Sequence, residues 1–163
     1  MFNRAVILCC LTLLALAPVL AQGAWTAAPG EGIGPLKLSM TVTQVNNLLA
    51  PTEVIGSMQN PRYVRYGDFL VEYASAKAVM YSWQSNTVKT KSGAVNLQLN
   101  AGIGVGTPFN MVETTFGRNY ISNDLKTAKG APRETYYAYR SLGLGFRTKA
   151  GRVAQVDIWA AAK

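Results

Sequence analysis

Apolar residues recur at helical spacing in two short stretches that open in the same way. Residues 32–49 and residues 102–117 both begin with Gly-Ile-Gly, and both continue with apolar side chains three or four positions apart. This spacing predicts a short amphipathic helix in each stretch. Aligning the two helices matches Val45 with Val112 and Leu49 with Phe116, which indicates an internal repeat.

The residues that flank the two helices predict where each helix starts and ends. Thr41 followed three positions later by Gln44 forms a capping box for the first helix. For the second helix we expect Thr107 as the N-cap, Pro108 at the first helical position and Gly117 as the C-terminal cap.

Alternating apolar and polar residues follow each helix and predict antiparallel strands. Residues 61–83 contain three such segments, and in the last one the alternating apolar residues are Val79, Tyr81 and Trp83. Residues 84–100 contain a further strand, and residues 137–158 contain a second meander. The side chains that alternation assigns to the helix-covered, buried face are Tyr66, Tyr73, Tyr81, Trp83, Tyr137, Tyr139 and Phe146.

These elements together predict an α+β fold of two tandem repeats, each a short capped helix packed on a small antiparallel sheet. The first repeat covers residues 32–100 and the second covers residues 101–163. Each unit alone is close to the size at which a hydrophobic core becomes marginal. We therefore expect the two units to pack on each other or to form one continuous layer.

The N-terminal residues have the pattern of a secretory signal peptide. A basic start, an apolar run and small residues before Gln22 predict cleavage after Ala21, so residues 1–21 form the leader. The alternative, a transmembrane anchor, is disfavoured because the apolar run is short and interrupted by Pro18. We expect a periplasmic or secreted protein without a transmembrane span, in which residues 22–31 form a flexible lead-in.

Composition argues against most enzyme classes. The chain has no histidine, and both of its cysteines lie inside the leader. The mature chain therefore lacks the usual ligands of zinc, copper and iron, and it lacks the Ser-His and Cys-His nucleophile pairs. Gly102-Ile103-Gly104-Val105-Gly106 does not have the spacing of a phosphate-binding loop. We expect no enzyme activity and no catalytic, cofactor-binding or metal site; a carboxylate-based hydrolase is the enzymatic alternative.

Basic residues exceed acidic residues, which bears on the choice of partner. The net charge of +8 becomes +7 when the leader, which contains Arg4, is removed. A basic secreted protein can approach an anionic envelope surface or an acidic protein. The basic residues are spread singly along the chain, however, which is also typical of a feature that serves solubility. Nucleic acid is not an expected partner, because the chain is exported and has no recognised binding motif.

The order of these motifs resembles two protein families. The motifs are, in chain order, a capped short helix, Tyr137-Ala138-Tyr139, Gly143-Leu144-Gly145-Phe146, a Lys-Ala-Gly-Arg turn and Val-Ala-Gln-Val-Asp-Ile. This order is similar to that of outer-membrane assembly lipoproteins of the SmpA/OmlA type and of tandem-repeat beta-lactamase inhibitory proteins. The resemblance implies two α+β units whose sheets dock a partner protein. The chain lacks the lipidated cysteine of the first family and the disulfides of the second, and fold transfers more safely than function.

The sheet faces opposite the helices are the candidate binding surface. Alternation places Glu72 and Asp157 there, together with six residues proposed to contact a partner: Tyr63, Arg65, Tyr136, Arg140, Arg147 and Trp159. Exposed Tyr, Trp and Arg are typical of protein-binding patches. In the alternative arrangement, the two sheets cover one another and bury these residues.

Two functions follow from this reasoning. The first is a non-enzymatic module that binds another extracytoplasmic protein as an inhibitor or immunity protein of an envelope enzyme. The alternative is an envelope assembly or maintenance factor that binds outer-membrane components or anionic glycans.

Overall fold

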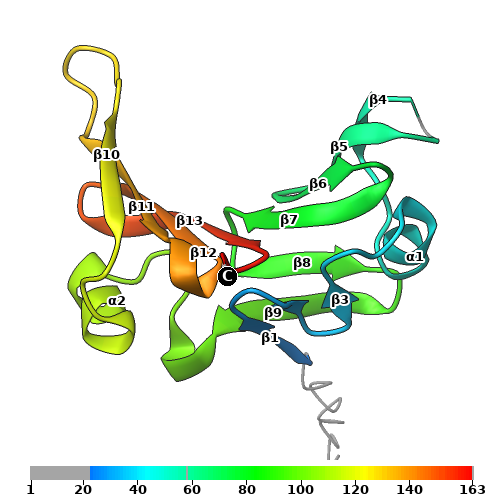
Figure 1. The fold of residues 1–163 in the computed structure, drawn as a ribbon, viewed down its shortest axis with the longest axis horizontal. Coiled ribbons are helices and arrows are strands. Elements are labelled where there is room, and N and C mark those ends of the chain that lie inside the picture. The colour runs from blue at the N-terminus through cyan, green and yellow to red at the C-terminus, as the bar shows by residue number, and fades with distance from the viewer. Residues whose placement is uncertain (1–22, 58, 163) are drawn as a thin grey trace, which may run out of the picture.

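The computed structural model describes residues 23–57 and 59–162, which form a mixed α+β fold of two sheets and two α-helices (Figure 1). The predicted leader and its two cysteines lie outside the described residues. None of the helices in the described part of the chain has the length and apolar character needed to cross a membrane.

The larger sheet has eight strands, and all of its neighbouring strands are antiparallel. It contains two meanders of four strands. The first consists of β4 (Glu53–Gly56), β5 (Pro61–Tyr66), β6 (Phe69–Ala74) and β7 (Lys77–Trp83). The second consists of β10 (Ile121–Leu125), β11 (Glu134–Tyr139), β12 (Leu144–Lys149) and β13 (Arg152–Trp159).

The two meanders are joined edge to edge. β13 pairs with β7, so that Asp157 lies opposite Ser82 and Trp159 opposite Met80, and the strand order is β10-β11-β12-β13-β7-β6-β5-β4. The alternative in which the two sheets cover one another is therefore wrong, and the second of the two expected arrangements, one continuous layer, is present.

The smaller sheet has five strands in the order β3-β2-β1-β9-β8. Its strands are β1 (Ala24–Ala28), β2 (Gly32–Ile33), β3 (Leu36–Lys37), β8 (Thr87–Thr90) and β9 (Gly93–Leu99). Residues 24–28, which we expected in a flexible lead-in, instead pair in parallel with β9 and antiparallel with β2. Partners that are distant in the sequence fix this segment, so local composition alone did not reveal it.

The two helices begin in different ways. α1 (Val42–Leu48) has the predicted capping box between Thr41 and Gln44. α2 (Phe109–Phe116) has Pro108 as its N-cap and Gly117 as its C-cap, so the prediction for Gly117 is confirmed and those for Thr107 and Pro108 are each wrong by one position. The Thr107 hydroxyl instead accepts a hydrogen bond from the backbone N–H of Gly104.

The core lies on one face of the eight-stranded sheet. The first meander faces the five-stranded sheet and α1, and the Tyr81 hydroxyl donates to the Lys37 carbonyl oxygen across this layer at 2.6 Å. The second meander is covered by α2, whose Phe109 and Phe116 rings pack against Phe146. Of the aromatics predicted for this face, Tyr66, Tyr73, Tyr81, Trp83, Tyr139 and Phe146 are buried.

Two residues of the predicted core differ from expectation. Tyr137 is only half-buried, and its ring stacks on Phe109 of α2 at a centroid distance of 3.7 Å. Val79 is exposed because the register between β6 and β7 shifts there: Met80 pairs with Glu72 and Ala78 pairs with Tyr73, which leaves Val79 as the extra residue of a bulge.

Candidate functional site

The face of the eight-stranded sheet opposite the core is open, and we call it the open face. In Figure 1 the smaller sheet and α2 lie below the large sheet, and β10 and β4 stand at its raised outer ends, so that the open face is concave. One row of cross-strand partners on it runs Trp159, Met80, Glu72, Tyr63 and Ile55 from β13 to β4. This row crosses the junction of the two meanders, so both contribute to one surface.

The structure brings the predicted binding residues to this surface. Tyr63 and Arg65 lie on β5, Tyr136 and Arg147 pair across β11 and β12, and Trp159 ends β13. Arg140 begins the short 3₁₀ helix η2 (Arg140–Leu142) that follows β11. Their role in binding a partner stays a prediction.

Tyr136 and Trp159 converge over Gly145 at the centre of the second meander. A Cβ atom at Gly145 would lie 2.2 Å from the Tyr136 hydroxyl oxygen and 2.8 Å from Cζ3 of the Trp159 ring. Both aromatic side chains therefore cross β12 directly above a position that has room for glycine only.

Asp157 fixes the position of Tyr136. The carboxylate of Asp157 is 3% exposed and accepts hydrogen bonds from the Tyr136 hydroxyl at 2.9 Å and from Nε2 of Gln155 at 2.8 Å. Burial, together with the neighbouring Asp157 charge, raises the pKa of Tyr136 above its ordinary value. Tyr136 therefore remains a protonated hydrogen-bond donor at neutral pH, and a buried carboxylate orients its ring.

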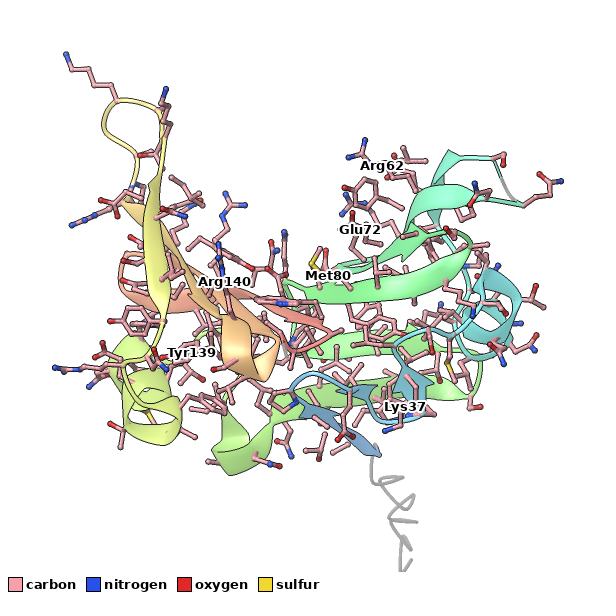
Figure 2. All side chains as sticks on the ribbon, viewed as in Figure 1. Lys37, Arg62, Glu72, Met80, Tyr139 and Arg140 are labelled. Carbon is pink, nitrogen blue, oxygen red and sulfur yellow. The ribbon has the colours of Figure 1, made fainter. Side chains whose placement is uncertain are left out.

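A hollow of about 520 Å³ opens beside these aromatic residues. Met80, Tyr136, Ala138 and Trp159 give it an apolar lining, and Arg140 lies at its edge. Figure 2 labels Met80 on β7 and Arg140 near the end of β11, at two sides of the concave surface. A pocket that is mostly apolar and has a single charged group is suited to an apolar side chain with a polar neighbour.

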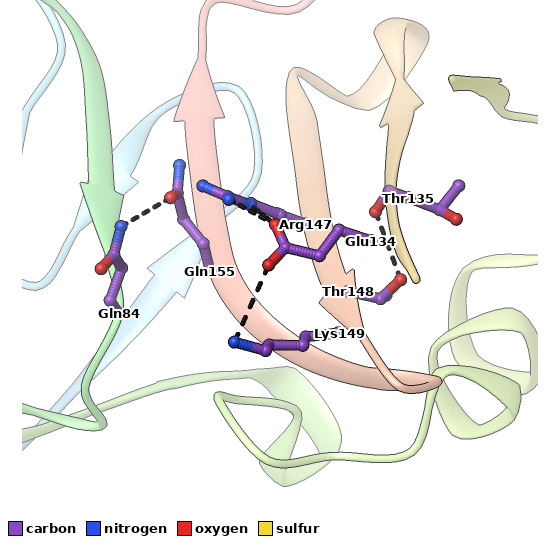
Figure 3. Close-up of polar contacts among 7 residues, drawn as sticks. All are labelled: Gln84, Glu134, Thr135, Arg147, Thr148, Lys149 and Gln155. Carbon is purple, nitrogen blue, oxygen red and sulfur yellow. Dashed lines mark hydrogen bonds and ion pairs between the residues drawn. The ribbon is translucent and has the colours of Figure 1, made fainter. Parts of the chain in front are cut away.

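A polar network continues along the open face towards the other end of β12 (Figure 3). Nε of Arg147 donates to Glu134 at 2.7 Å, and Nζ of Lys149 lies 3.9 Å from the same carboxylate. Nε2 of Gln84 donates to Oε1 of Gln155 at 2.9 Å, which links the end of the first meander to β13. These contacts hold the side chains around the aromatic centre in fixed positions.

The open face of the first meander is arranged more loosely. The Tyr63 hydroxyl donates to Glu72 at 3.3 Å, and the Arg62 guanidinium carbon lies 5.2 Å from the centre of the Tyr63 ring. Arg65 pairs with Glu53 at 3.1 Å, and about half of each of these two side chains is exposed.

No cluster of three or more potential metal ligands occurs within residues 23–57 and 59–162. The open face instead provides aromatic rings, an apolar hollow and hydrogen-bonding groups. These groups are suited to recognising a surface.

Sequence reasoning missed Gly145, Met80 and Ala138. An isolated glycine inside a strand pattern signals close approach by another group, so Gly145 could have been recognised. Met80 and Ala138 gave no such signal, because their importance depends on the pairing of β7 with β13 and on the path of the C-terminal residues.

Comparison of the chain with protein-family models, curated proteins and solved structures gave no match.

Proposed function

We propose that this protein is a non-enzymatic module of the cell envelope or the extracellular space that binds another extracytoplasmic protein through the open face, as an inhibitor or immunity protein. The observation that carries the proposal is the Tyr136 and Trp159 pair, which is held above Gly145 beside an apolar hollow.

The physical argument rests on preorganisation. Binding energy in protein interfaces is concentrated in a few residues, among which Trp, Tyr and Arg are enriched. Holding a side chain in place before binding reduces the entropy lost in the complex. Tyr136 is already oriented by the buried Asp157, and its ring lies directly against the backbone of Gly145. A partner that covers this centre therefore gains contact area at low entropic cost.

The two meanders also support an origin by tandem duplication. Each half contains a short helix followed by four antiparallel strands, and the two Gly-Ile-Gly stretches precede the two helices. This organisation is what the resemblance to the tandem-repeat inhibitory proteins implies. In this proposal the duplication doubled the width of a single docking surface.

Affinity capture with matched variants tests the proposed function. The tagged mature chain, Trp159→Ala and Met111→Ala are each incubated with an envelope extract, and the recovered proteins are identified by mass. Met111 lies on α2, away from the open face, and is 50% exposed. We expect one stoichiometric partner with the parent chain and with Met111→Ala, and loss of that partner with Trp159→Ala. Equal recovery with all three chains, or no partner with any, contradicts the proposal.

A further inference from the structure

The carboxylates on the open face are all engaged within the chain. Cross-strand pairing places four carboxylates there. Each accepts a hydrogen bond from a neighbour: Glu53 from Arg65, Glu72 from Tyr63, Glu134 from Arg147, and Asp157 from Tyr136 and Gln155. Each of these carboxylates therefore has a partner within the chain.

Some cations of the same surface, in contrast, have no acidic partner. Arg140 and Arg62 form no ion pair with any residue in the described part of the chain. Arg62 lies against the Tyr63 ring, towards the outer end of the first meander, whereas Arg140 borders the apolar hollow. The guanidinium groups of Arg140 and Arg62 are therefore available to pair with an acidic partner.

The backbone of Arg140 is fixed although its charge is unpaired. Its carbonyl oxygen accepts hydrogen bonds from the backbone N–H of Gly143 at 3.2 Å and of Ala162 at 3.1 Å. The N–H of Trp159 donates to the Gly143 carbonyl oxygen at 3.0 Å, which ties η2 to the end of β13. The guanidinium is thus attached to a rigid support next to Trp159, at one side of the hollow.

The geometry points to a specific kind of ligand for this hollow: a protruding loop of a partner protein that carries an apolar side chain next to a carboxylate. The apolar side chain contacts Met80, Ala138 and the rings of Tyr136 and Trp159, and the carboxylate pairs with Arg140. Arg140 is then the residue that selects acidic partners, because a basic loop would face an unneutralised charge. This inference rests on the proposed function and specifies the chemistry of the partner.

A displayed library of disulfide-closed random loops tests this inference without knowledge of the natural partner. The library is selected on the folded mature chain and depleted on Trp159→Ala, so that only loops that need the aromatic centre remain. We expect the enriched loops to place Asp or Glu within two positions of Leu, Phe, Tyr or Trp. Their affinity should fall about tenfold for Arg140→Glu, because an attractive charge pair becomes repulsive.

Two control variants separate Arg140 from general charge effects. Arg62→Glu changes the net charge equally, at the outer end of the first meander, and we expect it to change loop affinity less than about threefold. Replacing the acidic residue of a selected loop with Lys should restore its binding to Arg140→Glu. Thermal unfolding of each variant confirms that it is folded.

Three results would overturn the inference. One is enrichment of loops without an acidic residue, and another is a loop affinity that Arg140→Glu and Arg62→Glu reduce equally. The third is sedimentation of the chain with phosphatidylglycerol vesicles that depends on Arg140, which would assign this charge to a membrane surface. If the captured natural partner requires Trp159 but tolerates Arg140→Glu, the inference fails while the proposed function stands.

Discussion

The two halves of the open face have the same strand pattern but differ in rigidity. In the first meander, the ion pair of Arg65 and Glu53 is about half exposed, and Tyr63 makes a long hydrogen bond of 3.3 Å. In the second meander, Tyr136 is bound to a buried carboxylate, and Gly145 lets it lie flat beside Trp159.

The difference follows from a single row of residues. The cross-strand row through β12, β13, β7 and β6 contains Gly145, Asp157, Ser82 and Leu70. In this row the last strand of the second meander has the buried Asp157 and the last strand of the first has Ser82. The strand before it has Gly145 in the second meander and Leu70 in the first. Two halves with the same topology can therefore play different parts in binding: we expect the second to supply the rigid anchor and the first to supply adaptable surrounding contacts.

Filling the space above β12 should have the largest effect. Gly145→Ala forces Tyr136 to move away from the buried Asp157 and displaces the Trp159 ring. We expect the free energy of unfolding to fall by about 1–3 kcal/mol, as for other overpacked sites. Denaturant titration measures this change. Gly23→Ala is the control, since a Cβ there meets no atom within 4 Å, and equal stability of the two variants would contradict the account.

Removing one hydroxyl from each half compares the two tyrosines directly. Tyr136→Phe leaves the buried Asp157 with one donor fewer, and we expect a loss of about 1–2 kcal/mol in the free energy of unfolding. Tyr63→Phe removes a longer, partly buried bond to a carboxylate that is itself half-buried, and it should cost less than about 0.5 kcal/mol. Similar losses, again from denaturant titration, would show that Tyr136 is no more firmly fixed than Tyr63.

The ion pairs of the two halves should differ in the same direction. The Glu134 side chain is only 13% exposed, so Arg147→Ala leaves a largely buried carboxylate with only the distant Lys149. We expect a loss of about 1 kcal/mol. Arg65→Ala breaks an exposed pair and should change the free energy of unfolding by about 0–0.5 kcal/mol. A larger loss for Arg65→Ala would reverse the comparison.

The two halves also bear on the dependence of stability on alkaline pH. The folded state raises the pKa of Tyr136 above 10.0, chiefly through burial, and raises the pKa of Tyr139 to about 12. Above pH 10 the unfolded chain loses these protons while the folded chain retains them, so stability is full below pH 10 and falls as the pH rises further. Tyr136→Phe should make this fall shallower in unfolding measurements between pH 9 and 11. An equally steep fall would show that Tyr136 does not contribute.

The local elements of the fold were predictable from the sequence. The capping box at Thr41, the cap at Gly117 and the alternation that buries Tyr81, Trp83 and Phe146 depend on residues close together in the chain. Such signals are contained in a window of a few residues.

Pairing between distant segments was not predictable in the same way. The strand at Ala24–Ala28 forms because β9, about seventy residues later, offers a parallel partner. The hollow exists because β7 and β13 join and the C-terminal residues pass η2. The sequence identified Tyr136, Arg140 and Trp159 as candidates, but their convergence with Met80 over Gly145 depends on this long-range pairing.

The most direct test of the central claim is the effect of one alanine substitution in each half on the affinity for the captured partner. Calorimetric titration of Trp159→Ala should show a dissociation constant raised by about thirtyfold or more, as for an anchor residue worth about 2 kcal/mol. Tyr63→Ala should raise it by less than about fivefold. Equal effects, or a larger effect for Tyr63→Ala, would contradict the claim that the second meander holds the binding anchor.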